Sequence, residues 1–124
     1  MKILIVDDSR TARMLIKGSI PGNLEARIEE AENGKEGLEK FRSFLPDVTF
    51  LDLTMPVMDG FSFLSVLHEE YPKAVVIVLS ADIQRHSLSR VKELGALRFL
   101  KKPPELSEIH EALRAAQQIL GGVR

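Results

Sequence analysis

Short apolar runs alternate along the chain with longer segments whose apolar residues recur every three or four positions. The run at residues 3–6 is apolar throughout, which is typical of a strand buried on both faces. Further runs predict strands over residues 26–31, 48–51, 75–79 and 97–100. The range 26–31 is half polar, so we expect that strand at an edge of the sheet.

Helical spacing between these runs predicts five helices. Their expected positions are residues 9–19, 35–44, the segment between Asp59 and Pro72, residues 83–94, and a last helix that begins at Ser107. Asp59 and Ser107 are the predicted N-caps, and Gly95 is the predicted stop after the fourth helix.

The apolar positions also predict which face of a helix is buried. In the first helix we expect Leu15 and Ile16 to face the core, and Arg13 and Lys17 to face solvent. In the last helix the apolar residues at helical spacing are Ile109, Ala112, Leu113, Ala116 and Ile119.

Five strand–helix units in register predict an α/β fold with a doubly wound, five-stranded parallel sheet and helices on both faces. The chain has 124 residues, which is the size of one domain, so we expect residues 1–124 to fold as a single unit.

Composition excludes several classes of function. The 17 basic and 18 acidic residues give a net charge of −1, which argues against a general nucleic-acid binder. The absence of Cys excludes a disulfide scaffold, a thiolate nucleophile and a Cys-ligated zinc site. No apolar run has the length of a signal or membrane segment, so we expect a cytoplasmic protein without a membrane partner.

Polar side chains follow four of the five predicted strands at the point where each strand ends. They are Asp7 and Asp8 after the first strand, Asp52 after the third, Ser80 after the fourth and Lys102 after the fifth. In open α/β sheets, ligands bind beyond the carboxyl ends of the strands. The sequence therefore predicts three carboxylates, a hydroxyl and an ammonium at one edge of the sheet.

These groups suit phosphoryl chemistry that depends on a divalent cation. Crowded carboxylates repel one another, and a hard cation such as Mg²⁺ relieves that conflict. Ser80 can donate to a phosphoryl oxygen and Lys102 can neutralise another. A carboxylate can also act as a nucleophile and form an aspartyl-phosphate.

Four motifs give the chain a family resemblance. They are ILIVDDS at residues 3–9, DLTMPVMDG at 52–60, Ser80-Ala81, and GALRFLKKP at 95–103. In this order, and over essentially the whole length, the chain resembles the receiver domain of two-component response regulators, of the single-domain chemotaxis-regulator type. The resemblance implies a flavodoxin-like fold with strand order 2-1-3-4-5.

The resemblance also implies a role for each acidic residue. Asp52 would be the phosphoacceptor. Asp7 and Asp8 would hold Mg²⁺ together with Asp52, and the backbone carbonyl of Thr54 would add a ligand.

For the basic and polar side chains, the resemblance implies that Ser80 and Lys102 bind the phosphoryl group and that Phe99 is an aromatic switch residue acting with Ser80. Spacing from Phe99 selects Lys102 over Lys101, which the pleat directs to the opposite face. The resemblance further suggests a cis bond between Lys102 and Pro103, next to a second proline.

In function, the resemblance implies a switch that receives a phosphoryl group from a histidine kinase or a phosphotransfer protein. It would signal to a protein target through the fourth helix, fifth strand and last helix. Only self-phosphorylation and self-dephosphorylation are expected as catalysis. The molecule would be a monomer or a weak phosphorylation-dependent dimer.

Each site residue also has an ordinary structural interpretation, such as a helix cap for Asp7-Asp8 or a solvated lysine for Lys102. A magnesium-dependent small-molecule phosphatase or phosphotransferase is one alternative function, although such enzymes commonly carry a second acid where this chain has Thr54. A flavin or nucleotide binder would need a Gly- or Ser/Thr-rich loop after the first strand. A pseudo-receiver that only scaffolds partners is the remaining alternative.

Overall fold

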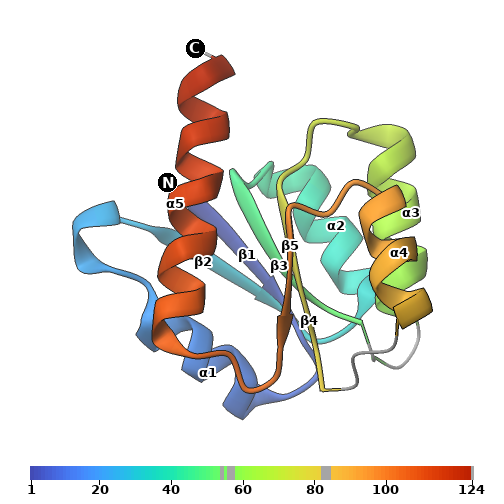
Figure 1. Ribbon diagram of the computed structural model, residues 1–124, viewed down its shortest axis with the longest axis horizontal. Helices are drawn as coiled ribbons and strands as arrows, with labels where there is room; N and C mark the ends of the chain where they lie inside the picture. Colours follow the sequence, from blue (N-terminus) through green and yellow to red (C-terminus); the bar gives the residue numbers. More distant parts are fainter. Residues whose placement is uncertain (54, 56–57, 82–84, 124) are drawn as a thin grey trace.

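The sheet has five strands, all parallel, in the order β2-β1-β3-β4-β5 (Figure 1). The computed structural model describes residues 1–53, 55, 58–81 and 85–123. The strands are β1 (Lys2–Val6), β2 (Arg27–Ala31), β3 (Val48–Asp52), β4 (Val76–Ser80) and β5 (Arg98–Lys101). The predicted fold class and strand order are confirmed, and β2 lies at an edge as expected.

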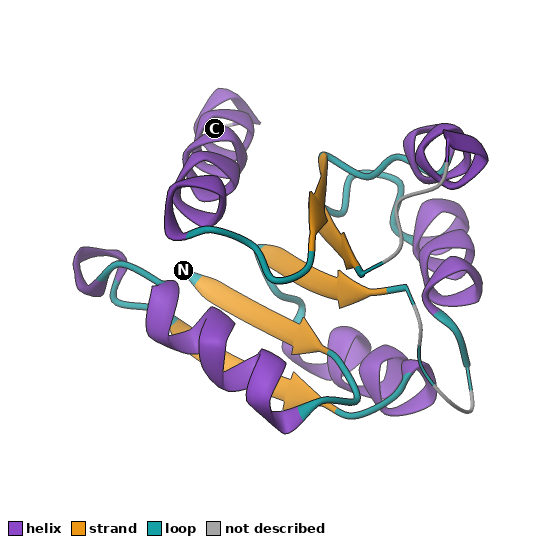
Figure 2. Ribbon diagram, turned by 60° about the horizontal axis from the view of Figure 1, so that its bottom comes forward, coloured by secondary structure: helices purple, strands orange, loops and turns teal. Residues whose placement is uncertain are grey.

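Helices cover both faces of this sheet. They are α1 (Arg10–Ser19), α2 (Gly34–Phe44), α3 (Gly60–Glu70), α4 (Arg85–Glu93) and α5 (Leu106–Val123), with a short 3₁₀ helix, η1, at Gly22–Leu24. Figure 2 shows α1 and α5 on one side of the strands and the other three helices on the opposite side. Among the described residues, no helix is both long and apolar enough to cross a membrane.

Alternation along each strand divides the core into two layers. In β1, Ile3 and Ile5 pack with Ile16 and Ile109 from the α1–α5 side. Leu4 and Val6, between them, pack in a second cluster. That second cluster also contains Leu38 of α2, Phe63 of α3 and Val91 of α4. Because successive side chains point to opposite faces, a continuous apolar run supplies both layers.

Local capping explains most helix boundaries. The Asp59 carboxylate accepts a hydrogen bond from the Ser62 backbone N–H at 2.8 Å, which confirms the predicted cap of α3. Gly95 follows α4 with a φ of +86°, a backbone conformation that favours glycine. The prediction for Ser107 was wrong: α5 begins at Leu106, and the Glu108 carboxylate accepts from the Glu105 N–H at 3.0 Å.

The predicted faces of α1 and α5 need three corrections. Arg13, expected in solvent, is only 8% exposed, whereas Leu15, expected in the core, is 44% exposed. Ile16 is buried as predicted, and Ile119 of α5 is exposed. Leu15 instead lines a surface groove between α1 and the segment after β5. Arg13 tolerates burial because its guanidinium finds two acceptors, which are described below.

Candidate functional site

The carboxyl ends of β1, β3, β4 and β5 bring the predicted site residues to one edge of the sheet. Asp7 directly follows β1, Asp52 ends β3, and Ser80 ends β4. These three side chains are buried, whereas Asp8 is exposed. The Lys102 N–H donates to the Ser80 carbonyl at 2.9 Å, which continues the β4–β5 hydrogen-bond ladder by one residue. Lys102 is therefore held beside the end of β4.

The three aspartates lie close enough to share one cation. Asp7, Asp8 and Asp52 each offer a carboxylate oxygen, and these oxygens lie within 4.8 Å of one another. Asp7 Oδ1 accepts from the Ser9 N–H at 2.9 Å, which fixes the carboxylate. Asp7 Oδ2 is buried and accepts no well-directed hydrogen bond from the described part of the chain. Such a set of hard carboxylate oxygens, two of them from buried side chains, fits Mg²⁺.

Lys102 supplies the positive charge of the site. Its Nζ lies 2.7 Å from Asp7 Oδ2 and 3.5 Å from Asp52 Oδ1. Burial disfavours the charged ammonium, but the Asp7 and Asp52 carboxylates outweigh that effect and raise the pKa of Lys102 above its usual value. Lys101 is exposed, as the pleat predicts, and the Lys102–Pro103 bond is cis, as the resemblance suggests.

A glycine lets the chain return against the backbone of the central aspartate. A Cβ on Gly60 would lie 2.5 Å from the Asp52 carbonyl oxygen and 2.5 Å from Leu53 Cα. The Gly60 N–H donates to the Leu53 carbonyl at 3.0 Å. Gly60 therefore packs α3 directly on the backbone at the end of β3, a contact that the sequence did not predict. Thr54 lies outside the described residues.

Phe99 lies in β5, two register positions before the pair of Ser80 and Lys101. In the β4–β5 register Phe99 pairs with Val78, while Ser80 pairs with Lys101. Phe99 is half-buried against the cluster beneath α2, α3 and α4. Its ring lines a groove of about 470 Å³ between α4 and β5. The lining residues are Leu88, Ser89, Val91, Lys92, Ala96, Leu97, Arg98 and Phe99.

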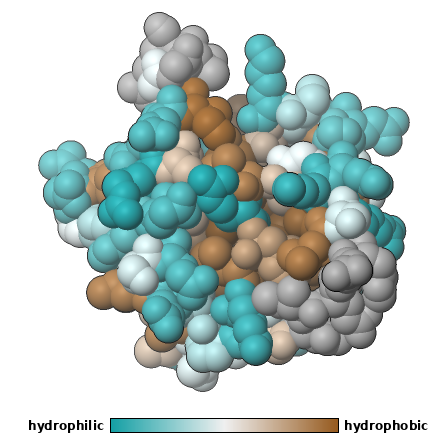
Figure 3. All heavy atoms as spheres, viewed as in Figure 1, coloured by the Kyte–Doolittle hydropathy of each residue, from teal (hydrophilic) through white to brown (hydrophobic). Residues whose placement is uncertain are grey.

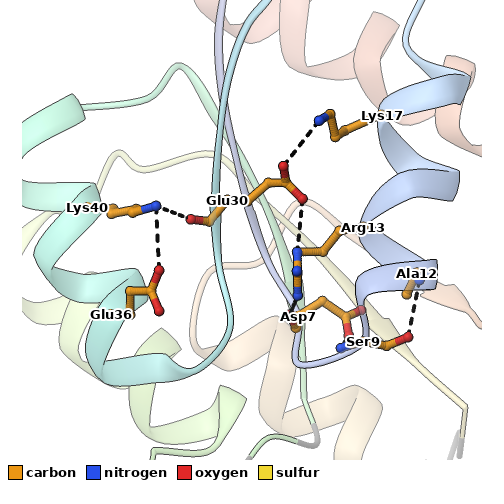
Figure 4. Close-up of polar contacts among 8 residues, drawn as sticks. All are labelled: Asp7, Ser9, Ala12, Arg13, Lys17, Glu30, Glu36 and Lys40. Carbon is orange, nitrogen blue, oxygen red and sulfur yellow. Dashed lines mark hydrogen bonds and ion pairs between the residues drawn. The ribbon is translucent and has the colours of Figure 1, made fainter.

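Two residues behind the site were missed by the sequence analysis. The Arg13 guanidinium donates to the Asp7 carbonyl at 2.8 Å and to the Glu30 carboxylate at 2.9 Å (Figure 4). Arg13 occupies a position in α1 that the hydrophobic pattern assigns to solvent. No sequence signal marks the contact, because Glu30 belongs to a different element, the edge strand β2.

The chain belongs to the response regulator receiver domain family, whose sequence profile matches residues 3–114. It is 37% identical over 116 residues to the chemotaxis protein CheY of Listeria monocytogenes, a match that covers 94% of this chain and 98% of that protein. The recognised resemblance is therefore confirmed at the level of the family.

Solved structures agree with the sequence comparison. The N-terminal domain of an uncharacterised Wolinella succinogenes protein superposes with a TM-score of 0.89 at 31% identity, covering 100% of this chain and 99% of that one. CheY in the CheX–CheY–BeF₃–Mg²⁺ complex of Borrelia burgdorferi superposes with a TM-score of 0.87 at 28% identity, covering 94% and 89%.

Proposed function

We propose that the protein is a phosphorylation-activated signalling switch that accepts a phosphoryl group on Asp52 from a histidine kinase or a phosphotransfer protein. The observation that carries the proposal is the meeting of three carboxylates within 4.8 Å, with the Lys102 ammonium against two of them. The relative solved with BeF₃ and Mg²⁺ supports the same chemistry.

In the transfer step, an Asp52 carboxylate oxygen attacks the phosphorus of a phosphohistidine. The new O–P bond forms as the P–N bond breaks, and the imidazole leaves with that electron pair and takes a proton from solvent. Lys102 and Ser80 bind the phosphoryl oxygens, which stabilises the negative charge of the product.

Bound Mg²⁺ would neutralise charge on the phosphoryl group during this step. Asp7, Asp8 and Asp52 would hold the ion with their carboxylates. By family resemblance the Thr54 carbonyl would be a further ligand.

The pairing of β4 with β5 supports a proposed route for the output. A phosphoryl group on Asp52 would draw Ser80 inward and open space into which Phe99 could turn. We assign the signalling surface to α4, β5 and α5, where apolar side chains gather among hydrophilic ones in the middle of the view (Figure 3). A protein target would bind the α4–β5 groove on this surface.

Residues 1–124 act as one receiver domain in the cytoplasm, as a monomer or a weak phosphorylation-dependent dimer. Its partners are proteins rather than nucleic acid or membrane, and its catalysis is limited to gaining and losing its own phosphoryl group.

Intact-mass spectrometry after incubation with acetyl phosphate and Mg²⁺ tests the proposal. We expect one added phosphoryl group per chain, no adduct without Mg²⁺, and none in Asp52→Asn. Asp47→Asn is the matched control because Asp47 precedes the same strand at its other end, where its carboxylate accepts the Lys2 N–H at 2.7 Å. This control should be phosphorylated like the wild type.

The alternatives give different results. A small-molecule phosphatase would rapidly hydrolyse many equivalents of p-nitrophenyl phosphate in a parallel assay, whereas a receiver carries no more than one phosphoryl group per chain at a time and loses it only by slow self-dephosphorylation. A scaffold would form neither the adduct nor a magnesium-dependent beryllium fluoride complex, and that result would contradict the proposed function.

A further inference from the structure

The Arg13 guanidinium joins three elements behind the aspartate cluster. From α1 it donates through Nη1 to the carbonyl of Asp7, at the end of β1, and through Nε to Glu30, on β2 (Figure 4). The Arg13 side chain is 10% exposed. A planar guanidinium with two acceptors in fixed directions constrains both of them.

Among the described residues, every polar atom of Asp7 has its own contact. Its N–H donates to the Ala31 carbonyl at 3.0 Å, and Oδ1 accepts from the Ser9 N–H at 2.9 Å. Oδ2 lies against Lys102, and the carbonyl accepts from Arg13. Because β1 ends at Val6, the Asp7 carbonyl lies beyond the strand and depends on the guanidinium for its partner.

Glu30 makes further contacts besides the one with Arg13. The other Glu30 oxygen pairs with Lys17 Nζ at 3.1 Å. Lys40 of α2 donates to the Glu30 backbone carbonyl and pairs with Glu36 at 3.5 Å (Figure 4). Contacts from α1 and α2 thus converge on the strand residue that holds the guanidinium.

We propose that Arg13 is a positioning residue of the magnesium site, acting through the Asp7 peptide. By holding the Asp7 carbonyl, Arg13 fixes the orientation of the peptide that follows Asp7. The orientation of that peptide in turn sets the position of the Asp7 carboxylate relative to those of Asp8 and Asp52. This inference rests on the proposed function, since it assumes that the aspartates bind Mg²⁺.

Whether Mg²⁺ binds more weakly or more tightly after Arg13 is replaced distinguishes a positioning role from a purely electrostatic one. A guanidinium near the site repels a divalent cation, so removal of its charge alone would strengthen Mg²⁺ binding. Loss of positioning acts in the opposite direction, because a displaced ligand weakens coordination. Partners that orient metal ligands typically contribute about 10- to 100-fold to metal affinity.

The experiment measures Mg²⁺ dissociation constants by ¹H–¹⁵N NMR titration of the wild type, Arg13→Gln, Arg13→Lys and Lys17→Gln. We expect about tenfold weaker binding in Arg13→Gln. Arg13→Lys keeps the charge but cannot bridge both acceptors in the same geometry. Its Mg²⁺ dissociation constant should lie between those of the wild type and Arg13→Gln. Lys17→Gln is the matched control: it removes a cation from Glu30 without touching Asp7 and should bind Mg²⁺ within twofold of the wild type.

Two further readouts exclude a merely structural role. The phosphorylation rate of Arg13→Gln at saturating Mg²⁺ should approach the wild-type rate. Unfolding in EDTA reports any general loss of stability, which should not account for the change in Mg²⁺ affinity. If Arg13→Gln does not fold, Arg13→Lys decides the question.

Unchanged or tighter Mg²⁺ binding in the folded Arg13 variants would overturn the inference while leaving the proposed function intact, provided the wild type binds Mg²⁺ and is phosphorylated. A wild type that binds no Mg²⁺ would overturn both. Weaker binding in Lys17→Gln equal to that in Arg13→Gln would also overturn the inference, because the effect would then not pass through Asp7.

Discussion

At the carboxyl edge of the sheet, the largely buried Lys102 ammonium contacts two buried carboxylates, whereas on the α4–β5–α5 face the charges are exposed around an apolar groove. Lys102 is 20% exposed at the side chain and pairs with an Asp7 side chain that is 1% exposed. On the α4–β5–α5 face, Arg98 and Glu111 join β5 to α5 at 3.0 Å, with side chains 40% and 48% exposed.

The two regions differ in how much stability each charged group loses when its partner is removed. A buried charge that loses its partner is destabilised strongly, whereas an exposed pair contributes about 0–1 kcal/mol. If Asp52 accepts a phosphoryl group, as proposed, the carboxyl edge would therefore respond sharply to it. The face can rearrange at small cost, which suits coupling between two sites of about 1–3 kcal/mol.

The largest effect on stability should come from Gly60→Ala, which disturbs the backbone at the carboxyl edge of the sheet. The new Cβ would lie 2.5 Å from backbone atoms of Asp52 and Leu53, and neither can move without shifting β3. We expect the free energy of unfolding to fall by about 3 kcal/mol in urea denaturation. Gly18→Ala is the control: nothing lies within 4 Å of its Cβ, and alanine favours the helix, so stability should rise slightly. A similar change in both variants would contradict the close-packing argument.

Lys102→Met should have the next largest effect. It leaves Asp7 Oδ2 and Asp52 without their shared ammonium, and we expect a loss of about 2 kcal/mol in EDTA. Mg²⁺ should restore more stability to this variant than to the wild type, because the cation replaces the missing charge. Lys101→Met, at the neighbouring exposed position that ends β5, should change stability little. Equal losses in the two variants would show that the edge does not depend on its ammonium.

The smallest effects on the free energy of unfolding should come from replacing Glu30 or Glu111, and these effects should depend on pH. Burial raises the pKa of Glu30, but hydrogen bonds from Lys17 and Arg13 outweigh it, so the pKa is lowered. The Arg98 guanidinium likewise lowers the pKa of Glu111. A lowered carboxyl pKa stabilises the fold above the unfolded value of about 4.3, and this stability is lost as pH falls through the folded value.

Urea denaturation at pH 7 and pH 3 measures both contributions. At pH 7 we expect Glu30→Gln to lose about 1 kcal/mol and Glu111→Gln about 0.5 kcal/mol or less. Both differences from the wild type should be smaller at pH 3 than at pH 7, because the wild-type carboxyls lose their charge as the pH falls through their lowered pKa values. A Glu111→Gln loss as large as that of Glu30→Gln would contradict the expectation that the pair with the buried Arg13 contributes more than the exposed pair with Arg98.

The strand and helix pattern could be predicted because it follows from local periodicity. The strand at residues 3–6 and the cap at Asp59 both depend on neighbours within one turn or pleat, and both were correct. Ser107 was assigned as a cap from residue type, but the Glu105–Glu108 contact lets α5 begin earlier. The placement of Asp7, Asp8 and Asp52 at one edge was predictable too, although their functional roles stay predictions.

The sequence by itself determined the family, the fold class and the edge at which the aspartates meet, because parallel strands necessarily end together. Only the tertiary structure decided how those groups are held. The Lys102 ammonium against Asp7, the Gly60 backbone against Asp52, and the buried Arg13 all join separate elements. Such contacts depend on how each helix tilts and packs on the sheet, and no local pattern in the chain encodes that geometry.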